Sequence, residues 1–416
     1  MFQIIANQPV PLKNFINQFA VFFSKRLFIS FAIYFSGLFI EFKRTSINSI
    51  SSKSSDTSYQ NLQYFISDSN WNSEFVNSKR LDLLATNPAT RSTKKGVLVI
   101  DDSSCKKWGT NTQGAKPQYS SVEDKTINCN VVVTSAYCDN KKRYPINLKP
   151  YIPKDDPLCT SLEVIFQSKL NLAADLIDHA IKHDINFSDI VFDSWYFCND
   201  LVKYIMSLKK YWISEAQADR RISYRRQWVR ADELVKLIPS SKFNRKVTLT
   251  HSNGKSSSFL VYGFKTFLKG FDKPLFVVVA VGKWDSHDPK NVHIFVTNHL
   301  TLYPEDVVKR YALRWGIECI FKDLKEFVAF DNYQVRSIKA ISHHWHLCVL
   351  AYTFLLWGKI TSGLSHRLKN KRLKTLGDAL RAIRSLSSVE ALNWANSNQQ
   401  AFAKVINIEP KFMFAA

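Results

Sequence analysis

The stretch from Tyr311 to Lys325 constrains the fold most, because it predicts a single helix with two different faces. It begins shortly after a proline, a residue favoured in the first turn of a helix. Apolar residues recur at every third or fourth position and form a stripe: Leu313, Ile317, Ile320, Leu324 and Val328. At about 100° per residue, the polar side chains fall within an arc of roughly 60°. These are Tyr311, Arg314, Glu318 and Lys325. A carboxylate beside two cations and a hydroxyl favours a metal ligand flanked by groups that bind phosphate.

Two short apolar runs upstream each end in an acidic residue. They are VLVI, which runs into Asp101 and Asp102, and IVF, which runs into Asp193. A buried strand that ends in an acid places the carboxylate at the edge of a sheet, where solvent and metal ions can reach it. Three carboxylates suffice to hold two Mg²⁺ ions, so we expect Asp101, Asp193 and Glu318 to lie together.

In these motifs the chain resembles bacterial insertion-sequence transposases of the DDE class, whose signature is Tyr, two residues, Arg, three residues, Glu, six residues, Lys. The phrases VIDDS and VFDSWY are similar to the family's motifs for the first and second acids. The resemblance implies an α/β fold: an RNase H-like mixed sheet with flanking helices, a β-rich insertion before the last catalytic helix, and a helical N-terminal module. It covers about residues 15 to 360.

The same resemblance implies roles for individual residues. The implied catalytic residues and metal ligands are Asp101, Asp193 and Glu318, with two Mg²⁺ ions as cofactor and Mn²⁺ as the alternative ion. The family's first motif has an Asp, a variable residue and then Ser or Thr, which favours Asp101 over the alternative, Asp102. The implied DNA-binding residues, which would hold phosphates of the cleaved strand, are Tyr311, Arg314 and Lys325.

The patterns divide the chain into five expected parts. Strands over 97–100, 130–137, 144–151 and 190–192, with a helix over 162–181, match the first half of an RNase H-like fold. The interval between Asp193 and Glu318 is too long for one connection and contains four further apolar runs that predict strands. The expected parts are a helical module that binds DNA ends (1–90), the first part of the core (91–205), the β-rich insertion (206–300), the last part of the core (301–365) and a helical C-terminal tail (366–416).

Composition restricts the partners and the compartment. The 416 residues include 57 Lys and Arg against 35 Asp and Glu, a formal charge of +22, which favours a polyanion such as nucleic acid. A lysine excess typical of an AT-rich genome is the alternative explanation. The seven cysteines include no C-x-x-C pair, so neither a zinc site nor a disulfide framework is indicated, and a reducing cytosol fits. The most apolar window, 27–40, is shorter than the roughly 20 residues needed to span a bilayer, and it predicts a buried helix.

Three further groups of residues have competing interpretations. A basic stretch with interleaved aromatics is either a DNA-contact strip or a solvated charge run: Arg220, Arg221, Tyr224, Arg225, Arg226, Trp228 and Arg230. Some relatives stack a flipped base on a Trp of the insertion, and the candidates, each with core packing as the alternative, are Trp212, Trp228 and Trp284. Three histidines without a second ligand cluster are expected in the core or near DNA rather than on a metal: His343, His344 and His346.

The leading hypothesis is a cut-and-paste transposase that acts on double-stranded DNA, on both the terminal inverted repeats of its element and the target. We expect a homodimer when DNA is bound, no membrane contact, and a bacterial, cytoplasmic, nucleoid-associated location. A catalytically silent DNA-binding protein derived from a transposase is the alternative, and the intact acids speak against it. A basic protein of the membrane surface is a third interpretation.

Overall fold

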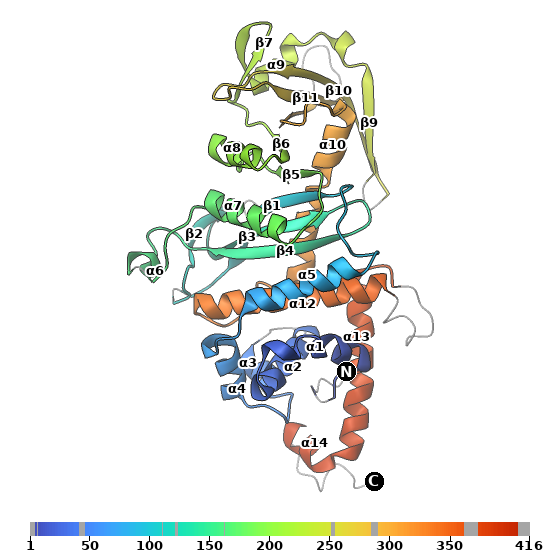
Figure 1. Cartoon of the computed structure of the whole chain (residues 1–416). Coiled ribbons are helices and arrows are strands. Elements are labelled where there is room, and N and C mark those ends of the chain that lie inside the picture. The colour runs from blue at the N-terminus through green and yellow to red at the C-terminus, as the bar shows by residue number, and fades with distance from the viewer. Residues whose placement is uncertain are drawn as a thin grey trace.

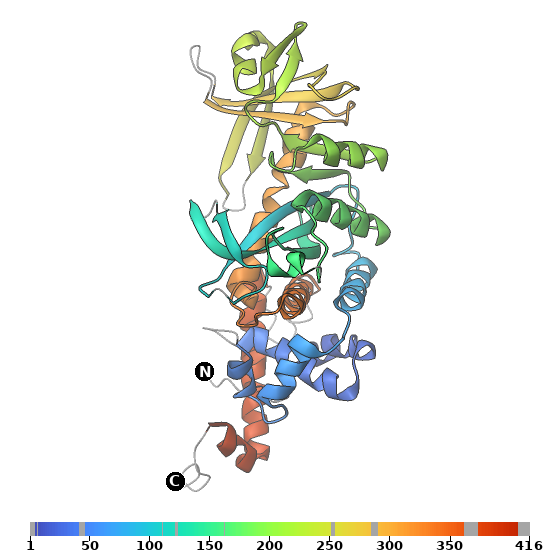
Figure 2. The ribbon, with the colours of Figure 1, turned by 90° about the vertical axis from the view of Figure 1, so that its left-hand side faces the viewer.

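The computed structural model describes most of the chain. The described residues are 5, 7–40, 46–109, 111–120, 124–161, 163–250, 254–283, 290–361 and 373–406. They form an elongated molecule with a mixed sheet in its middle, a β-rich part at one end and a helical part at the other (Figure 1). The same three-part arrangement is visible after a quarter turn (Figure 2).

A ten-stranded sheet runs from the middle of the molecule into the β-rich end. Its order is β2-β3-β1-β5-β6-β12-β11-β10-β9, and β4 also pairs with β3. The strands of the central part are β1 (Val97–Lys106), β2 (Lys116–Ser120), β3 (Lys125–Cys138), β4 (Arg143–Tyr151), β5 (Asp189–Phe192) and β6 (Tyr211–Glu215). β3 is antiparallel to β1 and to β4, whereas β5 is parallel to β1 and to β6. This is the RNase H-like mixed sheet that we predicted.

Helices cover both faces of the central sheet. On one face α7 (Lys169–Lys182) contacts β3 and β4, and α8 (Asn199–Ser207) contacts β6. On the other, α11 (Trp315–Val328) contacts β1, β3 and β4 (Figure 1). The helix predicted over 162–181 is wrong in its first part. It begins at Lys169, because the Ser168 side chain caps it by accepting a hydrogen bond from the Asn171 N–H at 3.2 Å; Leu162 lies outside the described residues.

The β-rich insertion extends the central sheet. Its strands are β9 (Arg245–Thr250), β10 (Ser256–Thr266), β11 (Leu275–Lys283) and β12 (Lys290–Thr297). β12 pairs antiparallel with β6, where Phe295 lies opposite Glu215 and Thr297 opposite Ile213. β11 is buried from Leu275 to Val281, as its continuous apolar run requires. A separate hairpin of β7 (Arg221–Tyr224) and β8 (Gln227–Arg230) precedes α9 (Ala231–Leu237) and the 3-10 turn η3 (Ser240–Lys242).

A buried ion pair fixes the helix that leads from the insertion back to the core. Asp189, the first residue of β5, is fully buried. Its carboxylate pairs with Arg310 of α10 (Pro304–Ala312) and lies 3.0 Å from Nδ1 of His299. This pair holds the start of β5 and α10 in one arrangement, because loss of Arg310 would leave the buried charge of Asp189 without its cation.

The helical end combines N-terminal and C-terminal segments. Its helices are α1 (Val10–Asn17), α2 (Lys25–Ile40), α3 (Ile47–Ser51), α4 (Tyr59–Gln63), α5 (Ser73–Thr86), α12 (Ile338–Ile360), α13 (Leu376–Ser397) and α14 (Gln399–Ile406), with short turns η1 (Ala20–Phe22) and η2 (Tyr64–Asp68); α6 (Pro157–Thr160) lies apart, beside the central sheet. α2 is buried from Ser30 to Ile40. Phe15 and Phe39 contact Phe354 of α12 at ring distances of 5.1 and 5.4 Å. Residues 30–40 of the apolar window are therefore core, as predicted, whereas Ile29 is exposed. No helix within the described ranges is long and apolar enough to cross a membrane.

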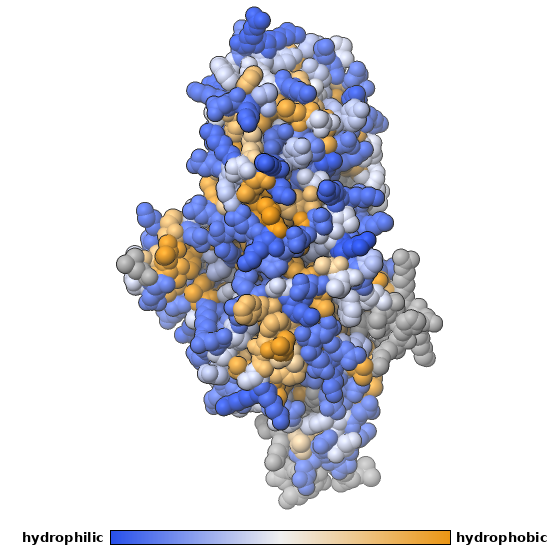
Figure 3. All heavy atoms as spheres, viewed as in Figure 1, coloured by the Kyte–Doolittle hydropathy of each residue, from blue (hydrophilic) through white to orange (hydrophobic). Residues whose placement is uncertain are grey.

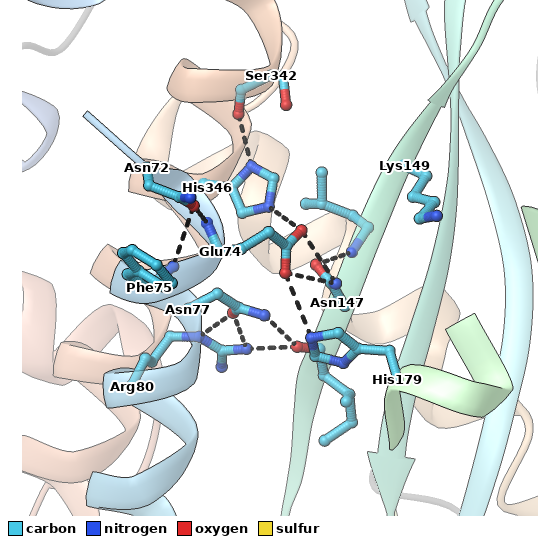
Figure 4. A network of polar contacts seen from close by, with 12 residues as sticks. Asn72, Glu74, Phe75, Asn77, Arg80, Asn147, Lys149, His179, Ser342 and His346 are labelled. Atoms are coloured by element: carbon cyan, nitrogen blue, oxygen red, sulfur yellow. Dashed lines mark hydrogen bonds and ion pairs between the residues drawn. The ribbon is translucent and has the colours of Figure 1, made fainter. Parts of the chain in front are cut away.

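A polar network joins α5 to the core (Figure 4). Arg80 is 1% exposed and donates five hydrogen bonds, which reach Asn77 Oδ1, the carbonyls of Pro145 and Ile146 in β4, and Thr353 Oγ1 in α12. Glu74, six residues earlier on α5, lies 3.3 Å from Nε2 of His179 in α7. Three elements distant in sequence are thus held by one helix of the N-terminal segment.

Hydrophilic side chains cover most of the face seen in Figure 3, with hydrophobic patches near α6 and over the helical end. Among the described residues, large apolar side chains that are highly exposed include Ile165 and Val21, at 86% and 80%.

Candidate active site

The register of the parallel strands brings the first two acids together. Ile100 of β1 lies opposite Phe192 of β5, and the pairing of these two strands ends there. Asp101 and Asp193 are the next residues on each strand, so they emerge side by side at that edge. β1 itself continues to Lys106 because β3 pairs with its whole length, so Asp101 lies within a strand and not at its end. The parallel pairing of β1 with β5 ends at Ile100, where we predicted the end of the strand, whereas the antiparallel pairing of β1 with β3 continues to Lys106.

Backbone amides fix the carboxylate of Asp193. Its Oδ1 accepts hydrogen bonds from the backbone N–H of Trp195 at 3.0 Å and of Tyr196 at 3.2 Å. The turn that follows β5 therefore orients this acid toward the strand end.

Arg314 joins the first acid to the third. One guanidinium nitrogen of Arg314 donates to Asp101 Oδ2 at 3.0 Å, and another donates to Glu318 Oε1 at 2.8 Å. The three side chains are largely buried, with exposures of 19% for Arg314, 16% for Asp101 and 34% for Glu318. Two carboxylates from β1 and α11 thus approach one cation, and Asp193 lies beside them.

The single helix predicted over 311–325 is wrong. α10 ends at Ala312 and α11 begins at Trp315, and the turn between them has short-range bonds such as Arg314 N–H to the Tyr311 carbonyl at 2.9 Å. A Cβ at Gly316 would lie 2.6 Å from Sγ of Cys138 in β3, so only glycine lets α11 approach the sheet this closely. The angle of about 100° per residue therefore does not apply between Tyr311 on α10 and the polar residues Glu318 and Lys325 on α11.

Tyr311 and Lys325 lie on either side of this arrangement. The Tyr311 ring packs against Phe295 of β12 at 4.7 Å, with the Arg314 guanidinium 5.9 Å from its centre. Lys325 Nζ donates to the Ser104 carbonyl of β1 at 2.8 Å. Tyr311 thus borders the insertion, whereas Lys325 borders β1 beyond Asp101.

Burial and mutual repulsion raise the pKa of the paired acids. The pKa of Asp101 rises to about 7, first through burial and then through the charge of Asp193, while Arg314 opposes the rise. The pKa of Asp193 is also raised, chiefly by burial. Such a pair gains from a cation that neutralises both members.

Asp102 has different partners from Asp101. Successive side chains of a strand point to opposite faces, and the Asp102 carboxylate accepts from Lys169 Nζ and from the Tyr196 hydroxyl, each at 2.9 Å. It is thus compensated by its own cation and lies apart from Arg314 and Glu318. This supports Asp101 as the acid of the site.

The acids are oxygen donors of the kind that Mg²⁺ prefers, and Asp101 and Glu318 already face one positive group. The donor set therefore suits a hard divalent ion. In the described part of the chain, no three His, Cys, Asp or Glu side chains are arranged to hold an ion. In this arrangement the guanidinium of Arg314 lies between Asp101 and Glu318 and is the positive group that pairs with both.

The predicted DNA-contact strip divides into different environments. Arg220 donates to the Phe197 carbonyl at 2.6 Å and packs over that ring, and Arg230 pairs with a neighbouring carboxylate. Arg225 and Arg226 are exposed at the tip of the β7–β8 hairpin, with φ values of 51° and 66°. This tip and the exposed Arg221 of β7 resemble a basic surface, and nothing in the sequence distinguished them from the rest of the run.

The tryptophan and histidine candidates are mostly core residues. Trp212 is fully buried in β6, Trp228 is 53% exposed on β8, and Trp284 lies outside the described residues. The three histidines of α12 are buried, and burial lowers the pKa of His343 and His344 to about 4. They are core groups, as one of the two interpretations held.

Residues 21–232 match the family described as DDE superfamily endonuclease, and residues 167–354 match the family described as Transposase DDE domain. The chain belongs to the DDE superfamily of endonucleases, and within it carries a transposase DDE domain. The predicted resemblance to DDE transposases is confirmed, whereas the Tyr-Arg-Glu-Lys signature and a bacterial origin remain predictions.

The chain is also similar to a solved structure, the cryo-EM structure of piggyBac transposase synaptic complex with hairpin DNA. The identity is 12%, the TM-score is 0.47, and the similarity covers 95% of this chain and 78% of that one. No curated protein matches the chain.

Proposed function

We propose that the protein is a DNA transposase that cleaves the ends of an insertion sequence and joins them to target DNA by phosphodiester hydrolysis and transesterification. One observation carries the proposal: Asp101 and Glu318 meet on the guanidinium of Arg314, beside Asp193, in a chain of the DDE endonuclease superfamily.

Asp101, Asp193 and Glu318 would hold two Mg²⁺ ions, or Mn²⁺ in their place, because carboxylate oxygens are the ligands that these ions prefer. Bound ions would supply activation of the attacking oxygen and stabilisation of the leaving oxygen. The raised pKa of Asp101 and of Asp193 supports this assignment, since neighbouring buried carboxylates gain most from added positive charge.

Arg314 has two roles in this proposal. Before substrate binds, its guanidinium compensates the charges of Asp101 and Glu318 and keeps the two acids close. Once those charges are otherwise neutralised, its planar donors are available for two oxygens of a DNA phosphate. The Tyr311 ring centre lies 5.9 Å from the Arg314 guanidinium, and Lys325 of α11 donates to the Ser104 carbonyl of β1. These two side chains would contact the same DNA strand on either side of Arg314.

The proposal also assigns roles to the remaining parts of the chain, of which the family implies the first. The helical module of residues 1–90 would bind the element ends, the insertion would contact DNA beside the acids, and the C-terminal helices would support a homodimer on DNA. The formal charge of +22 supports a polyanionic partner. A nucleoid-associated location in a bacterial cytoplasm follows from that partner.

The test is cleavage, by the purified protein with Mg²⁺, of DNA that carries the inverted repeats flanking its gene. Asp101→Ala, Asp193→Ala and Glu318→Ala should each abolish cleavage, because each removes one of the three acids. Binding to the ends, measured by electrophoretic mobility shift, should persist, because the acids are remote from the module that recognises the ends.

Asp102→Asn is the matched control, since Asp102 neighbours Asp101 on the same strand but faces Lys169. It should retain most of the cleavage. Cleavage at the wild-type rate by any alanine variant would remove that residue from the site. If the wild type binds the ends and cleaves none, the silent DNA-binding protein is the correct function.

A further inference from the structure

The guanidinium of Arg314 binds oxygens of two acids that a divalent ion would use. It donates to Asp101 Oδ2 at 3.0 Å and to Glu318 Oε1 at 2.8 Å. The other oxygen of Asp101 accepts from the backbone N–H of Asp102 at 2.8 Å, so both oxygens of this carboxylate already have a donor. An ion held between Asp101 and Glu318 therefore competes with the guanidinium for the same oxygens.

Charge makes this competition strong. The three acids of the site carry three negative charges when ionised, whereas two Mg²⁺ ions would bring four positive charges and Arg314 a fifth. Like charges at close range repel, and they repel more strongly in a partly buried site than in water. The Arg314 side chain is 19% exposed, so solvent screens the repulsion only in part. The protein without DNA therefore holds ions against the charge of its own arginine.

The side chain of Arg314 can leave the acids without a change in the fold. Its backbone is fixed in the turn between α10 and α11, where its N–H donates to the Tyr311 carbonyl at 2.9 Å. Its guanidinium lies 5.9 Å from the centre of the Tyr311 ring, within the range of a cation–π contact. The guanidinium can thus turn from the carboxylates to another anion while the backbone and the ring stay in place.

A DNA phosphate is the anion that fits this exchange. Two oxygens of one phosphate can accept the two donors that Arg314 directs to the acids, and the phosphate also offsets the excess positive charge of bound ions. We infer that a DNA phosphate and divalent ions bind this site cooperatively, because the phosphate takes the guanidinium that otherwise occupies the acids.

This inference rests on the proposed function and adds regulation of the same site to it. Ions are held firmly only when DNA is present, so the protein alone is kept from acting as a nuclease. Coupling between two ligands is reciprocal, so divalent ions strengthen the binding of DNA by the same factor.

The first experiment measures ion binding and not cleavage. Mn²⁺ is titrated into the full chain with and without pre-cleaved DNA ends, and free Mn²⁺ is followed by electron paramagnetic resonance, with binding to DNA alone subtracted. Wild type should bind Mn²⁺ about tenfold to a hundredfold more tightly with DNA, within the usual range of coupling between two ligands. Asp193→Ala should lose this tight binding, which assigns it to the acids.

Arg314→Gln should bind Mn²⁺ without DNA about tenfold more tightly than wild type, and added DNA should improve its affinity less than about threefold. A purely structural role for Arg314 predicts the opposite, because a disordered site would bind ions more weakly. Lys169→Gln is the matched control, because it also removes one positive charge near the site, but the partner of Lys169 is Asp102, at 2.9 Å. Its affinity for Mn²⁺ should stay within about threefold of wild type, since the charge it removes does not compete for the acids.

The second experiment uses wild-type protein, so it does not depend on how a variant folds. Methylphosphonates, which lack the negative charge of a phosphate, replace the terminal phosphates of the DNA ends one at a time. At one position the gain in Mn²⁺ affinity should fall below about threefold, because an uncharged group does not draw the guanidinium from the acids.

Three results would overturn the inference. They are a wild type that binds Mn²⁺ equally well with and without DNA, a folded Arg314→Gln protein that binds Mn²⁺ no more tightly than wild type, and a gain in affinity that survives every methylphosphonate. If any of them is found while wild type cleaves the ends with Mg²⁺, the coupling is wrong and the transposase stands. If wild type binds Mn²⁺ and DNA cooperatively but cleaves nothing, the coupling stands and the proposed function fails.

Discussion

Replacing Arg80 should detach α5 from the core. Arg80→Met keeps the length of the side chain and removes all five of its hydrogen bonds. Asn77 Oδ1 loses both of its guanidinium donors and the Pro145 carbonyl loses one, whereas the Ile146 carbonyl keeps the Asn77 side-chain amide at 3.1 Å. A buried acceptor without its partner costs about 1–3 kcal/mol. Two of them give a loss of about 4 kcal/mol, in the range for breaking a buried charged network.

The loss should appear as local opening, because Arg80 joins α5 to β4 and α12 and touches nothing in the insertion. Hydrogen exchange of the α5 amides is the appropriate assay, since it reports opening of one element at a time. A change of about 4 kcal/mol corresponds to an exchange rate about a thousandfold faster. Amides of β11 should exchange as in wild type.

Lys79→Met is the control, because Lys79 is the neighbour of Arg80 on α5 and is not a member of the Arg80 network. It should change α5 exchange much less. An Arg80→Met protein whose α5 amides exchange less than about tenfold faster would refute the reasoning that orphaned acceptors dominate the cost. In the double variant Asn77→Leu/Arg80→Met, the loss should be smaller than the sum of the two single losses, since removing both partners leaves fewer unpaired groups.

Three further predictions concern charge. Binding to DNA ends should weaken with salt with a log–log slope of about −5 or steeper, measured by mobility shift, and a flat dependence would contradict a phosphate-binding function. Arg314→Ala and Lys325→Ala should lose the joining of pre-nicked ends. Arg314→Lys should restore little of it, because an ammonium cannot make the planar two-pronged contact. Full joining activity with an unchanged melting temperature would mean that neither cation binds the DNA phosphates. The Glu74 pKa is lowered to about 2, first by its hydrogen bond to His179, so its stabilising effect is present above its usual value and is lost as pH falls toward 2. Glu74 is half-exposed, which limits its effect on the free energy of unfolding to about 1 kcal/mol. Glu74→Gln should therefore lower the melting temperature slightly at pH 6 and not at pH 2. An equal lowering at both pH values would contradict a role for the ionised carboxylate.

The sheet could be predicted where burial follows directly from the local pattern. The runs before Asp101 and Asp193 and the first seven residues of β11 are apolar throughout, and continuous apolar runs of this length form buried strands. The start of α7 was missed because the apolar spacing extends upstream of Ser168, whereas the cap decides where the helix begins. Neither the pairing of β12 with β6 nor its direction has any sequence signal.

The sequence names Asp101, Asp193, Glu318 and Arg314 as candidates, but it does not predict that Arg314 contacts both Asp101 and Glu318. The apolar spacing continues through Leu313 into α11, so the pattern contains no sign of the break between α10 and α11. The contact of Arg314 with Glu318 is an i,i+4 pair, whereas its contact with Asp101 depends on how α11 packs against β1. In the basic run, Arg220 and Arg225 look alike in sequence, yet one binds a carbonyl in the core and the other is exposed at a hairpin tip.

The antiparallel pairing of β12 with β6 has a mechanical consequence. In the described part of the chain, the insertion and the strands that carry Asp101 and Asp193 share one hydrogen-bonded sheet, and Asp189 pairs α10 with β5, so these residues show no hinge between them. A swinging arm needs a joint that can absorb large changes in backbone angles, and a continuous sheet offers none. The insertion and the strands that carry Asp101 and Asp193 are therefore expected to move together. If the protein cuts and joins DNA as we propose, repositioning between the two steps would be made by the DNA, or by a second copy of the chain, moving relative to this sheet.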